Sequence, residues 1–212
     1  MVYHVINRGV GKQKLFFNDD DYNAFERVMA ETLLKRPMRI LSYCLMPNHW
    51  HFVLWPEKNG DLGRFMQRLT ITHVTRWQKH YNLVGFGHVY QGRFKSFPVE
   101  TDEHFYQVVR YTERNALRAK LVGQAEDWPW SSLWIRHQGS AEHRELLSDW
   151  PLPRPRQWLQ YVNQIESEAE LESVRRSCRR GSPFGSAEWV GKTTKQLGLE
   201  STLRSPGRPK TQ

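Results

Sequence analysis

Apolar and polar residues alternate along three short segments near the start of the chain. The segments are VYHVIN at 2–7, MRILSYCLM at 38–46 and HWHFVLW at 49–55. A period of two residues is typical of β-strands, and Pro47-Asn48 between the last two segments favours a tight turn. The pattern therefore predicts one strand near the N-terminus and a hairpin formed by the other two.

A period close to 3.6 residues marks three helices. Apolar residues recur at helical spacing after an acidic, capping-type start at Asn18, and the longest such pattern runs from Leu62 to Tyr81. The third helix is expected from Thr101, which is followed by two acidic residues, to about Arg118. Before it, a glycine-rich loop at 85–92 leads into a short strand.

The order of these elements predicts an α+β fold. A ferredoxin-like βαββαβ order usually gives one antiparallel sheet with helices on one face. We assign residues 1–135 to this domain and 205–212 to a disordered tail. Residues 136–204 form a basic, mostly helical C-terminal extension that contains a proline-rich joint, WPLPRPRQW, at 150–158.

The charge distribution indicates a partner. The 212-residue chain has a net charge of +9, and residues 174–212 hold nine basic residues against two acidic ones. A basic tail on a nearly balanced body is typical of proteins that bind a polyanion, most often nucleic acid. A tail that only aids solubility would have the same composition.

Composition also narrows where the protein works. No stretch approaches the roughly 20 apolar residues of a membrane span, and the first ten residues lack the layout of a secretion signal. Two isolated cysteines, Cys44 and Cys178, do not make a disulfide framework. We therefore expect a cytoplasmic protein that does not enter a membrane.

Two histidines one residue apart, His49 and His51, open the second hairpin strand. Alternate residues of a strand share a face, so both imidazoles lie on one side, roughly 7 Å apart, and can converge on one cation. Two ordinary surface or core histidines explain this weak pattern as well. Structural zinc usually takes four ligands including cysteines, so Mg²⁺ or Mn²⁺, which keep open positions, fits this chain better.

The third predicted helix places Tyr111 on a polar, basic face, with Asn115 one turn later. An amide oxygen is a suitable third ligand for a hard cation. An ordinary amphipathic tyrosine at a helix surface would show the same pattern. Together with His49 and His51, however, these residues describe phosphoryl transfer, in which the Tyr111 oxygen attacks the phosphorus of a nucleic-acid backbone phosphate beside a bound cation and forms a phosphotyrosine link.

Four collinear motifs resemble those of one family. YHVINRG, LSYCLMPNHWHFVL, GHVYQGRFKSFPVE and RYTERNALRAKLV, the last followed by WPWSS, span about residues 3–135. Their order is similar to that in the REP-associated tyrosine transposases, which belong to the HUH single-tyrosine nucleases. The resemblance implies that His49, His51 and Asn115 bind the metal and that Tyr111 is the nucleophile. One departure is Asn115-Ala116-Leu117, where many relatives have Asn-Pro-Val.

The resemblance also implies a substrate and a setting. It implies cleavage of single-stranded DNA beside a hairpin of the repetitive extragenic palindrome type, through a 5′-phosphotyrosine intermediate. The enzyme would be a monomer or homodimer that works near the bacterial nucleoid. Seven basic residues are predicted to contact DNA phosphates, which position the strand: Arg8, Lys12, Lys14, Arg93, Lys95, Arg114 and Arg118.

Two other functions are compatible with these residues. A non-catalytic nucleic-acid-binding protein that retains the fold would bind with steep salt dependence and would not cleave. A replication or plasmid-transfer nicking enzyme would share the chemistry, but the small size and the lack of a helicase-like region favour it less.

Overall fold

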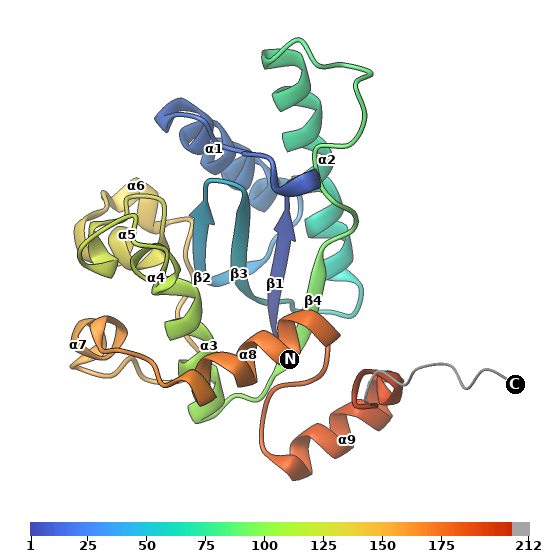
Figure 1. Cartoon of the computed structure of the whole chain (residues 1–212), viewed down its shortest axis with the longest axis vertical. Coiled ribbons are helices and arrows are strands. Elements are labelled where there is room, and N and C mark those ends of the chain that lie inside the picture. The colour runs from blue at the N-terminus through green and yellow to red at the C-terminus, as the bar shows by residue number, and fades with distance from the viewer. Residues whose placement is uncertain (205–212) are drawn as a thin grey trace, which may run out of the picture.

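The computed structural model describes residues 1–204 and contains a four-stranded antiparallel sheet at its centre (Figure 1). The strands are β1 (Val2–Arg8), β2 (Arg39–Met46), β3 (His49–Trp55) and β4 (Lys95–Val99), in the order β2-β3-β1-β4. The hairpin predicted at Pro47-Asn48 joins β2 to β3. The disordered tail predicted at 205–212 lies outside the described residues.

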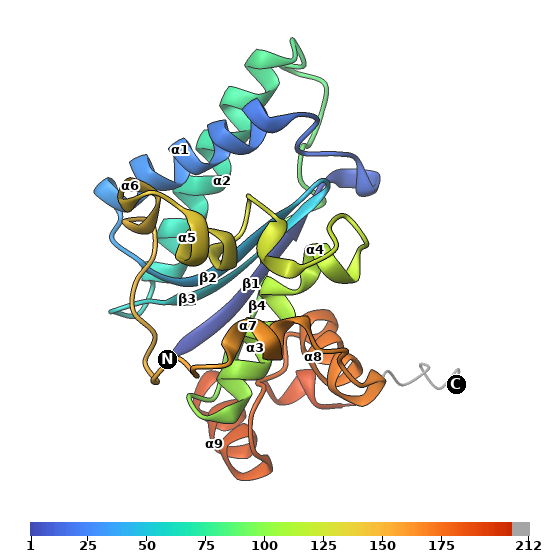
Figure 2. The same ribbon diagram turned by 90° about the vertical axis from the view of Figure 1, so that its left-hand side faces the viewer.

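One face of the sheet is covered by the two long helices of the βαββαβ unit. These are α1 (Asp19–Lys35) and α2 (Asp61–His80), which lie side by side above the sheet in Figure 2. Asn18 begins α1 with a reciprocal capping box to Asp21, so the predicted helix start is confirmed. The core on this face consists of aromatic and aliphatic residues from both helices and from the alternate strand positions that include Trp50.

The opposite face is also covered, although helices were expected on one face only. The tyrosine helix α3 (Glu103–Glu113) leaves β4, crosses to this face and packs on β2 and β3 (Figure 2). The α+β class, the element order and the antiparallel sheet are as predicted. The difference has a physical reason, because the strands bury apolar residues on both faces and α3 presents Phe105, Val108 and Val109 to the second one.

None of the helices in residues 1–204 is long and apolar enough to cross a membrane.

Apart from η1 (Val10–Lys12), a single-turn helix between β1 and α1, the remaining helices of the described chain follow α3. They are α4 (Asn115–Arg118), η2 (Ala125–Asp127), α5 (Ser132–Gln138), α6 (Ala141–Arg144), α7 (Trp158–Asn163), α8 (Glu168–Arg180), α9 (Ala187–Leu197) and η3 (Glu200–Thr202).

Part of the C-terminal extension is built into the core formed with residues 1–135. Trp158 of α7 is buried against α3 and donates its indole N–H to the Glu113 carboxylate at 2.7 Å. Phe184 pairs with the edge strand β4, where its N–H donates to the Pro98 carbonyl at 2.9 Å. The extension is mostly helical, as expected, but residues 158–184 complete the second face of the sheet instead of forming a separate layer.

Replacement of Trp158 by alanine measures how much the extension contributes to folding. We expect the free energy of unfolding to fall by about 3–5 kcal/mol, because the change leaves a large cavity and removes the hydrogen bond to one oxygen of the buried Glu113 carboxyl group, whose other oxygen keeps Ser132. Urea unfolding followed by circular dichroism would give this value. Ile165→Ala is the matched control, since Ile165 lies in the same extension and is 90% exposed. Equal, small effects of both changes would contradict an integrated extension.

Candidate active site

The two histidines of the HWH segment lie on the sheet face that α3 covers. In the strand register, His51 is opposite Ile6 of β1 and Cys44 of β2, and His49 is opposite Arg8 and Met46. The two imidazole centroids are 5.1 Å apart. The predicted sharing of one face is therefore confirmed, and both residues line the same cleft.

Hydrogen bonds fix the protonation of His49. Its Nδ1 lies 2.6 Å from Asn48 Oδ1, while Asn48 Nδ2 donates to the Lys12 carbonyl. Because the Asn48 oxygen can only accept, the His49 proton sits on Nδ1 and the lone pair is on Nε2. Burial, with the charges of Arg8 and Arg118, lowers the pKa of His49 to about 4. The ring is thus neutral at physiological pH, as a metal ligand must be.

His51 is held by a third histidine that the sequence analysis did not select. His4 of β1 is completely buried, and its Nε2 lies 2.9 Å from His51 Nδ1. Burial lowers the pKa of His51 well below its usual value and that of His4 to about 3, so both rings are neutral. When His51 Nδ1 donates to His4, the Nε2 lone pair of His51 is left for a ligand.

Tyr111 lies against these histidines. Its ring centroid is 5.7 Å from that of His51 and 6.2 Å from that of His4. The sequence placed Tyr111 on a polar helix face, but it is only 8% exposed and belongs to the core cluster under α3. Burial raises the pKa of its phenol to about 12, partly opposed by Arg118 and Arg175. At neutral pH the phenol is therefore protonated.

Asn115 follows Tyr111 by one helical turn and faces the same cleft. Its Oδ1 accepts a hydrogen bond from Arg118 Nη2 at 2.9 Å, and its buried Nδ2 has no protein partner in residues 1–204. The Arg118 guanidinium also stacks 4.2 Å above the Tyr111 ring. Asn115 is thus placed beside the tyrosine as predicted, with one of its two oxygen lone pairs taken by Arg118.

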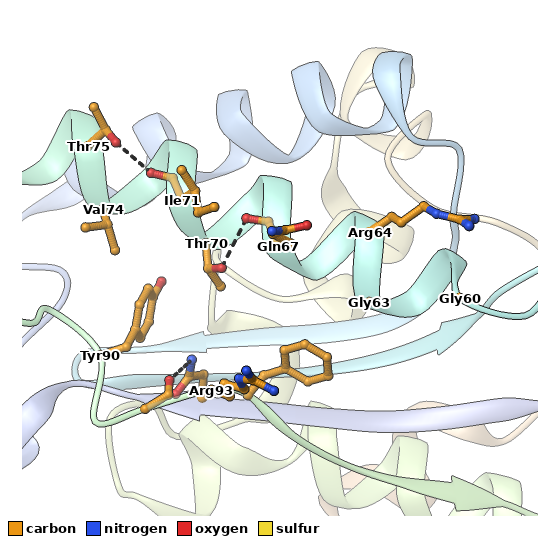
Figure 3. Close-up of a pocket in the computed structure, with 13 residues that line it drawn as sticks. Gly60, Gly63, Arg64, Gln67, Thr70, Ile71, Val74, Thr75, Tyr90 and Arg93 are labelled. Carbon is orange, nitrogen blue, oxygen red and sulfur yellow. Dashed lines mark hydrogen bonds between the residues drawn. The ribbon is translucent and has the colours of Figure 1, made fainter.

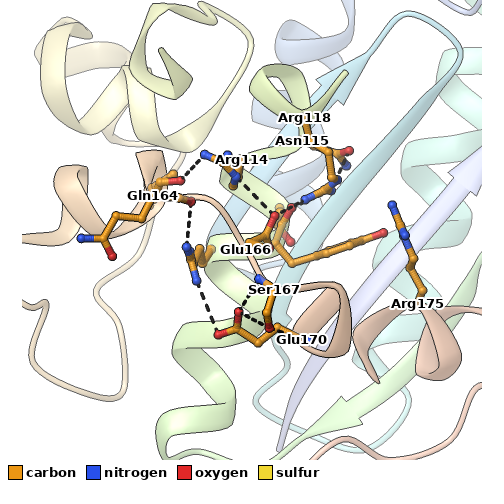
Figure 4. Close-up of polar contacts among 12 residues, drawn as sticks. Arg114, Asn115, Arg118, Gln164, Glu166, Ser167, Glu170 and Arg175 are labelled. Carbon is orange, nitrogen blue, oxygen red and sulfur yellow. Dashed lines mark hydrogen bonds and ion pairs between the residues drawn. The ribbon is translucent and has the colours of Figure 1, made fainter. Parts of the chain in front are cut away.

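Glu166 holds two of the predicted DNA-contacting arginines inside the protein (Figure 4). Arg118 Nη1 lies 2.9 Å from Glu166 Oε2, and Arg114 Nε lies 3.4 Å from the same atom. Arg114 also donates to the carbonyls of Val162 and Asn163 at 2.8 Å. These contacts fasten α3 and α4 to the extension, so Arg114 serves packing in this structure and is not free to meet a phosphate.

The cleft itself has a volume of about 720 Å³ and a basic lining. Four of the predicted phosphate-contacting residues line it, whereas Lys14 is exposed elsewhere. No acidic residue of the described chain contributes to the lining. The four predicted residues are Arg8, Lys12, Arg93 and Lys95, and Arg179 of α8 adds a fifth positive charge.

The residues of the cleft fit a divalent cation. Two neutral imidazoles share the cleft with the Asn115 amide, whose oxygen accepts one hydrogen bond and keeps a second lone pair, and a divalent cation such as Mn²⁺ or Mg²⁺ can take such nitrogen and oxygen ligands together with water. Another group of possible ligands in the described residues is Glu100, Asp102 and His104. These three have structural partners, since Asp102 caps α3 and Glu100 accepts the Ser186 N–H.

Comparison with known proteins identifies the family. The model of the family "Transposase IS200 like" matches residues 1–115, which is more than half of the chain. The chain belongs to this family. No curated protein sequence matches this IS200-like family member.

One solved structure supports the fold of this IS200-like family member. It is a REP-associated tyrosine transposase bound to a REP hairpin, with a TM-score of 0.53, 17% identity, and coverage of 78% of this chain and 85% of that chain. The resemblance inferred from sequence is thus confirmed for the family and the fold. A candidate transposase from Deinococcus radiodurans R1 has a TM-score of 0.41, 13% identity, and coverage of 66% and 92%.

Four residues of the site in this family member were missed at the sequence level. His4 lies in the motif YHVINRG and Asn48 in the motif LSYCLMPNHWHFVL. A polar side chain within or beside a predicted strand could have indicated that each contributes to the site. Cys178 and Arg179 come from α8, 67 and 68 residues beyond Tyr111 in the numbering, and reach the cleft only because the extension folds back. No local pattern in the sequence indicates that return.

His4 tests whether the imidazole network prepares the site. His4→Phe keeps the stacking on Phe97, whose centroid is 4.8 Å away, but removes the partner of His51 Nδ1. We expect Mn²⁺ affinity, measured by titration calorimetry, to fall by about 10–100-fold. His73→Phe is the control, because His73 is equally buried and hydrogen-bonded but lies on the opposite face of the sheet. Equal losses in both variants would assign His4 a purely structural role.

Proposed function

We propose that this protein is a metal-dependent single-stranded DNA endonuclease and strand-transferase that acts at hairpin-forming repeats through a 5′-phosphotyrosine intermediate. The observation that carries the proposal is the placement of Tyr111 beside His51 and Asn115, with His49 in the same basic cleft. Membership of the IS200-like transposase family is consistent with this chemistry.

The proposed step exchanges one phosphoester for another. The Tyr111 oxygen attacks the phosphorus of a backbone phosphodiester and gives up its proton to solvent. The bond from phosphorus to the 3′ oxygen of the preceding nucleotide breaks, and that oxygen takes up a proton. The products are a free 3′-hydroxyl and a 5′-phosphotyrosine, from which a second hydroxyl can later displace the tyrosine in strand transfer.

The surrounding residues favour this step in distinct ways. His49, His51 and Asn115 would hold a divalent cation, which when bound polarises the phosphate and stabilises negative charge. Arg118, stacked on the Tyr111 ring, lowers the pKa of the phenol against the effect of burial. Arg8, Lys12, Arg93 and Lys95 would neutralise phosphates on either side of the cleavage point.

The proposed substrate is a single strand with an adjacent hairpin. The structurally similar REP-associated transposase is bound to a REP hairpin, and this chain resembles it over 78% of its length. A cleft with five cationic side chains and no acidic one in the described residues suits a polyphosphate strand. We place the protein in the bacterial cytoplasm, where such DNA is found.

A non-catalytic DNA-binding role is the second candidate, and two observations favour it. Tyr111 is almost covered, with a pKa raised to about 12, and the Asn115 oxygen already accepts a hydrogen bond from Arg118. For cleavage, DNA or the cation must compete for these contacts. A protein that only binds would leave them unchanged.

Covalent capture distinguishes the two candidates. The protein would be incubated with Mg²⁺ and a labelled pool of single-stranded hairpins that carry random unpaired flanks. The mixture would then be denatured and separated by gel electrophoresis. Our proposal predicts a labelled protein band that resists denaturation and that does not form when EDTA is present from the start of the incubation. A pool that is bound and retained on a filter but never attached covalently would favour the binding role.

A further inference from the structure

A second hollow, of about 730 Å³, lies beside the cleft on the other side of the chain segment that leads into β4. Its upper wall is the exposed side of α2, from Gly60 at the helix N-terminus to Thr75. Tyr90 and Arg93 lie opposite α2 (Figure 3), and Asn7, Gly92 and Phe94 also line the hollow. Of the residues that line this hollow, the mechanism above uses Arg93 alone.

The two hollows adjoin each other. Asn7, Gly92 and Arg93 contribute to the lining of both. Asn7 Nδ2 donates to the Gly92 carbonyl at 3.2 Å, and this bond ties the segment between the hollows to the end of β1. Gly92 has no side chain, and a Cβ added there would meet no atom within 4 Å. No side chain at Gly92 therefore projects over the segment that separates the cleft from the second hollow.

The residues that line the second hollow are chemically complementary to an unpaired nucleic-acid strand. The lining contains two arginines, Arg64 and Arg93, and no acidic residue of the described chain. Two apolar residues share the lining, and Ile71 is 58% exposed while Phe94 is partly buried, so the hollow also offers apolar surface. Unpaired bases offer flat apolar faces and phosphates offer negative charge, whereas stacked, paired bases do not expose their faces.

Tyr90 makes the floor of this hollow rigid. Its hydroxyl accepts a hydrogen bond from the Trp50 indole N–H at 3.0 Å and lies 2.7 Å from His73 Nδ1. Tyr90 is therefore anchored to the protein core on this side of the groove. A rigid site loses little entropy when a strand binds.

We propose that this α2 groove, lined by Arg64, Gln67, Ile71, Arg93 and Phe94, binds the unpaired continuation of the DNA strand whose phosphate lies in the Tyr111 cleft. The inference rests on the proposed function for the identity of the strand. The groove adds length to the recognised segment, because it holds nucleotides beyond those that meet the tyrosine. It would make the protein prefer substrates with a long unpaired flank.

The test uses two groove variants and two matched controls. Arg64→Ala and Ile71→Glu alter exposed groove residues. Arg68→Ala on the same helix and Leu34→Glu on α1 change exposed residues that do not line the groove. Fluorescein-labelled oligothymidines of about 5 and about 15 nucleotides serve as probes, since single-strand sites commonly cover about 4–16 nucleotides. All variants also carry Tyr111→Phe, so that binding is measured without chemistry.

We expect the parent protein to bind the long probe at least about 10-fold more tightly than the short one. Arg64→Ala should lower affinity for the long probe about 5-fold and reduce the salt slope by about 0.7, the value for one released counterion on a single strand. Ile71→Glu should remove most of the length preference, and the controls should retain it. Unchanged length preference in both groove variants would overturn the inference.

The binding test of the groove can fail or succeed independently of the covalent-capture test of the proposed function. If the active protein forms no covalent adduct with any hairpin pool, the proposed chemistry fails, but the length preference of the Tyr111→Phe proteins still reports on the groove. If adducts form and the groove variants bind like the parent, the chemistry stands and the groove inference is wrong.

Discussion

Tyr111→Phe is expected to abolish covalent attachment to DNA and to leave DNA binding within about twofold of the wild type. Phenylalanine keeps the ring that lies between His51 and the Arg118 guanidinium, so the cleft should retain its shape. It removes the only atom proposed to attack phosphorus, and loss of a nucleophile commonly lowers the rate by more than about 10³-fold. The measurement is the initial rate of adduct formation with a 5′-labelled hairpin in Mg²⁺.

Tyr106→Phe is the control for this experiment. Tyr106 lies on the same helix, but its hydroxyl donates to the Pro153 carbonyl at 2.7 Å and does not line the cleft. We expect it to form the adduct at close to the normal rate. If Tyr111→Phe still became attached to DNA, another residue would be the nucleophile, and the cleft beside Tyr111 would not be the site of attack.

The second large effect is expected from His49→Ala and His51→Ala. Each change removes a neutral imidazole that lines the cleft, and we expect Mn²⁺ affinity to fall by about 100-fold or more. This loss is larger than the roughly 10–100-fold loss typical when only a hydrogen-bond partner of a metal ligand is removed. Titration calorimetry of the free protein measures this directly. Adduct formation at a fixed, low Mn²⁺ concentration should decrease in parallel.

His104→Ala separates this site from the other group of possible ligands. His104 lies with Glu100 and Asp102 at the start of α3, away from the residues that line the cleft. We expect His104→Ala to bind Mn²⁺ like the wild type. The opposite result, normal affinity in the His49 and His51 variants and a loss in His104→Ala, would move the metal to the N-terminus of α3.

The elements of the first 120 residues could be predicted because their patterns are local. Alternation identified the strands, Pro47-Asn48 identified the hairpin turn, and Asn18 identified the start of α1 through its cap. The face that α3 covers could not be predicted in this way. It depends on β4 lying at the edge of the sheet and on Trp158 and Phe184 returning from the extension, and these are contacts between distant segments.

In the candidate site, too, the residue types could be predicted from local patterns, whereas the contacts between distant segments could not. His49, His51, Tyr111 and Asn115 were selected for their residue types and spacing, and the structure brings them to one cleft. The sequence could not show that Tyr111 would be buried, because α8 contributes Cys178 and Arg179 to the same cleft. Nor could it show that Arg114 would be held by Glu166 and two carbonyls, since that depends on how the loop before α8 is placed.

The central claim is that Tyr111 becomes linked to a DNA 5′-phosphate. The most direct test is to trap the wild-type protein with a hairpin pool in Mg²⁺, digest the denatured adduct with trypsin and nuclease, and locate the attached nucleotide by mass spectrometry. The account predicts a phosphonucleotide on Tyr111. A nucleotide on any other side chain, or bound DNA with no modified peptide, would contradict it.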